Sequence, residues 1–229
     1  HGEVTSENAH PHIDCKNQLA IVHNGIVENF ISLKKLLEDK GHVFRTQTDT
    51  EVLAHLIEEY YDGNLMQSVR SALNHVEGTY GIAVIHMENP NEIVAARKGS
   101  PLILGIGDDG HYLASDVSAI LRHTDKVIYI DDNELVRIEM GKYEIRDMEN
   151  IPIKKDVEKI SWTLDMIEKK DYKHYMLKEI FEQSEVLRNA IRGRINIEDG
   201  DARLDGLDRH RDFFQKVKRI IITACGTSW

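Results

Sequence analysis

Asn24 and Gly25 are the residues whose types and position first suggest chemistry. They follow Gln18 to His23, a short apolar run that we expect to form a buried strand. At the end of a strand, a side-chain amide and the N–H of an adjacent glycine can both donate to one developing oxyanion. Asn-Gly is also a common turn dipeptide, and the spacing alone favours a simple turn.

A carboxylate in the run Thr48 to Glu51 is the second candidate. Asp49 could hold the ammonium group of a substrate. The alternative is an ordinary helix N-cap followed by an acidic first turn, which complements the helix dipole. Composition alone favours the cap.

The end of the chain combines an apolar run with a hydroxyl-rich turn. Arg219 to Ala224 is typical of a parallel strand, and Cys225 to Ser228 follow it. The hydroxyls of Thr227 and Ser228, together with free backbone N–H groups, could cradle a phosphate at the start of the next helix. They could equally cap that helix. Cys225 fits a small buried residue better than a nucleophile.

Potential metal ligands gather near the start of the chain, at His10, His12, Cys15 and His23. Their atom types suit zinc. However, no second compact pair of ligands follows, as a structural zinc site usually requires. We therefore expect loop packing here rather than a metal site.

Elements of two kinds must position these residues. Helical spacing of apolar residues predicts helices at Glu28 to Lys40, Thr50 to Tyr61 and Leu65 to His75. From Thr79 onwards the chain instead shows short β-rich runs separated by turn residues. Helices followed by a series of strands predict an α+β fold. The expected strands are Thr79 to His86, Glu92 to Ala96, Leu102 to Gly105, His111 to Ala114, Lys126 to Ile130, Glu134 to Glu139 and Tyr143 to Arg146.

The rest of the chain up to Val217 is expected to form a connecting region. Ile151 to Asp171 and Ile195 to Asp208 have the composition of linkers, and Tyr172 to Arg192 has the spacing of one long helix. A short helix is expected at Arg209 to Val217.

Composition narrows the class of protein. The chain has 229 residues, a net charge of −10 and two cysteines. The acidic balance disfavours nucleic acid as a partner, and no apolar run reaches the length of a membrane span. Sparse cysteines favour the reducing cytoplasm. The chain begins in a loop-like stretch and ends directly after a strand, so we expect it to be a piece of a longer protein.

Taken together, the motifs resemble one family. HGEVTSENAHPH, HNGIVEN, TDTEV, RKGSPL, ASD, KHYMLKEIFEQ and ACGTS occur in the order seen in glutamine–fructose-6-phosphate aminotransferases, or glucosamine-6-phosphate synthases. The resemblance implies part of an N-terminal nucleophile hydrolase fold, an αββα sandwich, then a helical linker and the first strand of an α/β sugar isomerase domain. It implies a glutamine amidotransferase domain over residues 1–147, a linker over 148–217 and the start of the isomerase domain over 218–229.

The resemblance also assigns roles. Asn24 and Gly25 match the oxyanion hole, Asp49 matches the carboxylate that holds the α-ammonium of glutamine, and His1 and Gly2 match a loop that contacts glutamine. Thr227 and Ser228 match the first sugar-phosphate-binding turn. The implied partners are glutamine and fructose 6-phosphate, no metal or organic cofactor is implied, and the family is typically homo-oligomeric.

This sequence departs from the family pattern at its start. The family's N-terminal cysteine nucleophile is expected before His1, and neither Cys15 nor Cys225 matches it. We therefore expect this chain to be inactive alone. Two alternatives stay open: a non-catalytic module that binds glutamine or sugar phosphate, and another class II amidotransferase, such as one acting on phosphoribosyl pyrophosphate.

Overall fold

The protein is described by a computed structural model that covers residues 2–160, 172–191, 195–196, 201–202, 211–214 and 216–221. The chain divides into two compact units, residues 1–167 and 168–229, and each is described by itself. No helix within the described ranges is long and apolar enough to cross a membrane.

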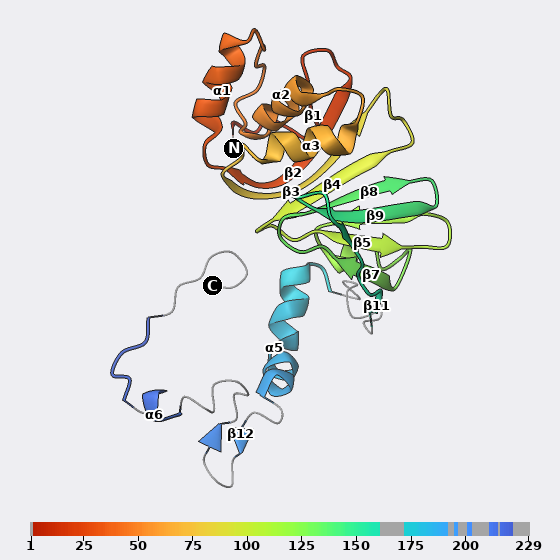
Figure 1. The fold of residues 1–229 in the computed structure, drawn as a ribbon. Helices are drawn as coiled ribbons and strands as arrows, with labels where there is room; N and C mark the ends of the chain where they lie inside the picture. The colour runs from red at the N-terminus through yellow and green to blue at the C-terminus, as the bar shows by residue number, and fades with distance from the viewer. Residues whose placement is uncertain are drawn as a thin grey trace. The chain divides into compact units, whose positions relative to one another are not determined.

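Three helices form one layer of the first unit (Figure 1). They are α1 Phe30–Asp39, α2 Thr50–Tyr60 and α3 Leu65–Leu73, close to the predicted ranges. In α1, the apolar residues Leu33 and Leu37 are buried while Ile31 faces solvent, as the spacing requires. Gly41 then has a φ of 95°, a left-handed conformation that commonly follows a helix end.

The helices cover a seven-stranded antiparallel sheet with the order β1-β2-β3-β4-β8-β9-β10. Strands β3, β4 and β8 are buried because helices lie on one face and a second sheet lies on the other. The strands are β1 His12–Ile13, β2 Leu19–Val27, β3 Gly78–His86, β4 Ile93–Lys98, β8 Glu134–Glu139, β9 Lys142–Asp147 and β10 Pro152–Ile153.

The second sheet has four strands in the order β11-β7-β5-β6. It packs on the first sheet through a separate apolar core that includes Leu104, Ile128 and Val136. The short 3₁₀ helix η1, Val117–Ala119, lies beyond this sheet and joins a third apolar cluster. Its strands are β5 Ile103–Ile106, β6 His111–Ala114, β7 Lys126–Tyr129 and β11 Glu158–Lys159.

The first unit therefore has helix, sheet and sheet layers, which fits the predicted α+β class. Within the described residues we observe one layer of α-helices, so the second helix layer of an αββα sandwich stays a prediction. Residues 148–160 differ from the predicted linker: β10 pairs with β9 and β11 pairs with β7, so this stretch adds an edge strand to each sheet. The division into domains at 147 and 217 stays a prediction.

The second unit contains α5 Tyr175–Ile191, α6 Arg211–Phe214 and the short pair β12 Ile195–Asn196 and β13 Asp201–Ala202. The helix α5 matches the predicted long helix. The strand expected at 219–224 is not observed at 219–221, and its remaining residues lie outside the described ranges.

Candidate functional site

Asn24 and Gly25 lie inside a strand, so the predicted Asn-Gly turn is wrong. Strand β2 continues through them to Val27, with Gly25 opposite Tyr80 of β3. Gly25 has a φ of 148°, and a Cβ at this position would lie 2.1 Å from the carbonyl oxygen of Thr79. Glycine is therefore required here by the close approach of a neighbouring strand as well as by backbone conformation.

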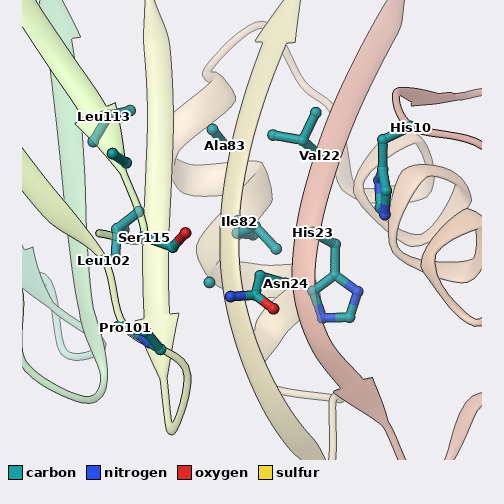
Figure 2. A pocket seen from close by; sticks show the side chains of 12 residues that line it. His10, Val22, His23, Asn24, Ile82, Ala83, Pro101, Leu102, Leu113 and Ser115 are labelled. Carbon is teal, nitrogen blue, oxygen red and sulfur yellow. The ribbon is translucent and has the colours of Figure 1, made fainter. Parts of the chain in front are cut away.

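The side chain of Asn24 lines a cavity of about 280 Å³ between the two sheets. Figure 2 shows its amide beside Ile82 of β3, with Leu102, Leu113 and Ser115 on the side of the second sheet. Within the described part of the chain this amide makes no hydrogen bond, so its donor and acceptor are available to a ligand. The other lining residues are His10, Val22, His23, Gly81, Ala83, Pro101 and Ala114.

Asp49 is buried, with 6% of its surface exposed, and it stands at the N-cap position of α2. Its side chain makes no capping hydrogen bond, so the cap that composition favoured is not formed. Instead the Oδ2 atom accepts a hydrogen bond of 2.7 Å from the Val27 N–H of β2. The Oδ1 atom is buried and has no partner among the described residues. Since an unpaired buried carboxylate oxygen is costly, this atom is suited to a ligand donor.

A second hydrogen bond joins α2 to β2 on the other side of Asn24 and Gly25. His23 Nδ1 lies 2.9 Å from the hydroxyl oxygen of Thr50, and His23 Nε2 lies 3.3 Å from the carbonyl oxygen of Thr79. A carbonyl only accepts, so Nε2 carries the proton and Nδ1 accepts from Thr50. Burial lowers the pKa of His23 below 6.5, which favours the neutral ring. The start of α2 is thus fixed against the stretch of β2 that holds the two candidate oxyanion donors.

The loop that contains Gly2 lies against the loop before Asp49. Asn8 donates to the Glu3 carbonyl and accepts from the Gln47 N–H, at 2.9 Å in both cases. A Cβ at Gly2 would come within 2.7 Å of the Gln47 Cβ, so this position is closely packed. Asn8 and Gln47 could not be identified from the sequence, because no local pattern indicates contacts between residues so far apart in the chain.

Four of the predicted site residues fall in the described ranges, namely Gly2, Asn24, Gly25 and Asp49. His1, Thr227 and Ser228 lie outside them, as does Cys225. The sequence brought Cys15 together with His10, His12 and His23 as candidate ligands, but the thiol contacts none of these histidines. The Cys15 Sγ atom instead lies 3.6 Å from His42 Nδ1 and 3.4 Å from His55 Nδ1. The sequence signal that we missed is the pair His55 and Glu58, which share one face of α2.

Comparison with known proteins gives consistent matches. A glutamine–fructose-6-phosphate aminotransferase (isomerizing) of Chlorobaculum tepidum is 45% identical over this whole chain, and one of Bacteroides thetaiotaomicron is 46% identical. The chain spans 38% of the length of each relative. Among solved structures, glutamine phosphoribosylpyrophosphate amidotransferase from B. subtilis matches with a TM-score of 0.55 and 27% identity, over 63% of this chain and 32% of that one.

The family model described as a glutamine amidotransferase domain matches residues 3–122. This range includes Asn24, Gly25 and Asp49, both hydrogen bonds that join α2 to β2, and strands of both sheets. Because the match covers more than half of the 229 residues, the chain belongs to the glutamine amidotransferase family.

Proposed function

We propose that the first unit is the glutamine-binding part of a glutaminase. We propose further that the longer protein uses the released ammonia to convert fructose 6-phosphate to glucosamine 6-phosphate. This proposal is supported by the two relatives named for that reaction, which match the whole chain at 45% and 46% identity. It also agrees with the cytoplasmic setting that the sparse cysteines suggest.

The free oxygen of Asp49 is the observation that carries the proposal. The carboxylate is buried, one oxygen is held by the Val27 N–H, and the other has no partner among the described residues. In this proposal Oδ1 accepts a hydrogen bond from the α-ammonium group of glutamine. A charged donor suits this position because hydrogen bonds between charged groups are the stronger kind.

Asn24 and Gly25 serve as oxyanion donors in the same proposal. The Asn24 amide lines the cavity between the sheets and has no competing partner within the described ranges. The Gly2 loop, with His1, completes the glutamine site, and Thr227 and Ser228 contact the sugar phosphate. No metal or organic cofactor takes part in this reaction scheme.

We also propose that Cys15 is not the nucleophile of glutamine hydrolysis. Its thiol contacts His55, which belongs to α2 in the helix layer, whereas Asn24 lines the cavity on the opposite face of the seven-stranded sheet. Neither Cys15 nor its contacts His42 and His55 line that cavity, so this thiol is not positioned to attack an amide whose oxyanion Asn24 holds. We therefore expect the 229-residue chain to release no glutamate from glutamine, and sustained release would contradict this part of the proposal.

A different amidotransferase is the main competing function. The phosphoribosylpyrophosphate enzyme shares the fold over 63% of this chain, whereas the two aminotransferases match all of it. Sequencing the gene beyond Trp229 separates the two. Sugar isomerase repeats would agree with our proposal, and a phosphoribosyltransferase motif would contradict it.

The glutamine site can be tested by NMR titration of the 229-residue chain, with the Val27 amide as the reporter because it donates to Asp49. Glutamine should shift the Val27 signal, and an analogue that lacks the α-ammonium group should shift it less. Asp49→Asn should abolish this difference. Asp39→Asn is the matched control, since it removes one exposed carboxylate at the end of α1 and should leave the difference intact. An equal response of Val27 to both ligands in the unmodified chain would argue against the role of Asp49.

A further inference from the structure

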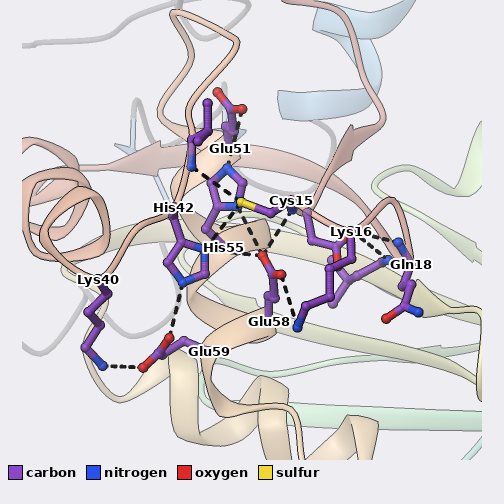
Figure 3. Close-up of polar contacts among 12 residues, drawn as sticks. Cys15, Lys16, Gln18, Lys40, His42, Glu51, His55, Glu58 and Glu59 are labelled. Carbon is purple, nitrogen blue, oxygen red and sulfur yellow. Dashed lines mark hydrogen bonds and ion pairs between the residues drawn. The ribbon is translucent and has the colours of Figure 1, made fainter.

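A compact group of metal-ligand atoms lies in the helix layer, among residues that do not line the cavity around Asn24. Cys15, His42, His55 and Glu58 each contribute one such atom, and within the described residues these four atoms lie within 4.8 Å of one another. Figure 3 shows that they come from separate segments: Cys15 from the turn between β1 and β2, His42 from just after α1, and His55 and Glu58 from one face of α2.

The spacing of these atoms matches a tetrahedral zinc centre. With zinc–sulfur bonds of about 2.3 Å and zinc–nitrogen or zinc–oxygen bonds of about 2.0–2.2 Å, neighbouring ligand atoms are about 3.3–3.6 Å apart. The Cys15 Sγ atom lies 3.6 Å from His42 Nδ1 and 3.4 Å from His55 Nδ1. Glu58 Oε2 lies 3.2 Å from His42 Nδ1 and 3.4 Å from His55 Nδ1. Four of the six edges of the tetrahedron therefore have the expected length or differ from it by about 0.1 Å.

Both histidines present Nδ1 to the centre and Nε2 to a second carboxylate. His42 Nε2 lies 3.2 Å from Glu59 Oε2, and Glu59 is in turn paired with Lys40. His55 Nε2 lies 3.5 Å from Glu51 Oε1, an ion-pair distance whose geometry falls short of a full hydrogen bond. Once Nδ1 binds a metal, the ring proton resides on Nε2, where the second carboxylate can accept it. This is the usual outer arrangement around a metal-binding histidine.

The donor atoms at the centre also suit a divalent cation. With both Nε2 atoms protonated, the centre faces two imidazole lone pairs, a carboxylate oxygen and a thiol that has one proton to share. The backbone N–H of Val43 also lies 3.4 Å from the Cys15 sulfur, where it can donate to a metal-bound sulfur. A divalent cation would satisfy all four atoms, and its charge would be balanced by one thiolate and one carboxylate.

The site is enclosed. The side chains of His42, His55 and Glu58 are 8%, 1% and 7% exposed. A centre with four protein ligands and little access to water is typical of structural zinc, because a catalytic site keeps a position open for water or substrate.

We propose that Cys15, His42, His55 and Glu58 bind one zinc ion, which ties the β1–β2 turn and the end of α1 to α2. The binding releases the thiol proton and forms a zinc–thiolate bond, without oxidation or reduction. The proposal departs from our sequence-based expectation of no metal, and it does not depend on the proposed glutaminase function.

The first test uses the 229-residue chain itself. After treatment with a chelator and reloading with zinc, elemental analysis should give one zinc ion per chain, and the midpoint of thermal unfolding should rise with zinc concentration. Cobalt in place of zinc should give a thiolate-to-cobalt charge-transfer band together with the strong visible absorption of tetrahedral cobalt. Failure of the folded chain to bind zinc at one equivalent, or cobalt binding without the charge-transfer band, would overturn the proposal.

Four variants locate the ion. Cys15→Ser should lose the charge-transfer band, and Glu59→Gln should keep the band but bind zinc about 10–100-fold more weakly, as expected for loss of a partner of a metal ligand. His75→Gln is the control, because His75 pairs with Tyr60 outside the cluster and should bind zinc normally. Should Cys15→Ser fail to fold, the Glu59→Gln affinity and the cobalt spectrum of the unmodified chain decide the question. Zinc binding that is lost in His10→Ala and kept in Cys15→Ser would place the ion elsewhere and contradict the proposal.

Discussion

Replacing Gly25 with alanine should destabilise the protein through a steric clash inside the sheet. The added Cβ would lie 2.1 Å from the Thr79 carbonyl oxygen, and this oxygen belongs to a paired strand that cannot rotate away. The backbone strain of a non-glycine residue at a φ of 148° costs about 1–3 kcal/mol. The forced separation of β2 from β3 adds about 1–3 kcal/mol, as for other overpacked sites. The total, roughly 2–6 kcal/mol, is a large part of the ~5–15 kcal/mol that stabilises a typical domain.

The assay is unfolding in urea, monitored by far-ultraviolet circular dichroism. The free energies of unfolding are compared between variants that have the same dependence of this free energy on urea concentration. Gly41→Ala is the matched control, because Gly41 has a φ of 95° and no atom within 4 Å of an added Cβ, so it shows backbone strain alone. Gly78→Ala should resemble Gly25→Ala, since its Cβ would meet the Ile26 carbonyl oxygen at the same 2.1 Å. If Gly25→Ala and Gly41→Ala agree within about 0.5 kcal/mol, the size of an ordinary surface effect, the clash argument is refuted.

Two further predictions concern single side chains. Burial lowers the pKa of His23 below its usual 6.5, so the unfolded chain binds a proton more readily than the folded chain does. The stability that depends on the neutral His23 ring is therefore complete above pH 6.5 and is lost as the pH falls below this value. The free energy of unfolding measured near pH 7 and near pH 5 should therefore fall less in His23→Gln than in the unmodified chain, and an equal fall would contradict the buried neutral ring. Asn64 accepts a hydrogen bond of 3.1 Å from the Gln67 N–H at the start of α3, so Asn64→Ala should cost about 1 kcal/mol in urea unfolding. Asn74→Ala at the other end of α3 is its control, and equal effects of the two changes would show that the cap is not the cause.

The helices could be predicted from the sequence because their signals are local. In α1, Leu33 and Leu37 recur at the spacing of one helix face, and Gly41 marks the end. Each of these signals depends on residues a few positions apart, which is the range over which helix formation is decided.

The candidate site was harder to predict because its contacts are distant in the sequence. The Asn24–Gly25 pair is compatible with a turn, and only the approach of Thr79 shows why glycine is needed within a strand. Asp49 is likewise a residue type that often caps helices, but its carboxylate accepts a hydrogen bond from the Val27 N–H of β2. Local composition could not distinguish these cases, since the deciding partners come from β2 and β3.

The same reasoning applies to the surroundings of Cys15. In the sequence, its neighbouring candidate ligands are His10, His12 and His23. The fold instead brings Cys15 to α2, where His55 and Glu58 lie one turn apart. Pairs at this helical spacing are a signal that a sequence search for ligands could include.

The pairing of β2 with β3 has a consequence for how the chain reaches its native state. Leu19 pairs with His86 and Val27 pairs with Gly78, so every residue from 28 to 77 lies within the loop that this pairing closes. Closing that loop costs conformational entropy before the strand contacts can form and offset it. Helices α1, α2 and α3 all lie within it, and their collapse shortens the distance that the two strand ends must cover. We therefore expect the helix layer to form early in folding and the central sheet to close late, on the slow timescale typical of non-local strand pairing.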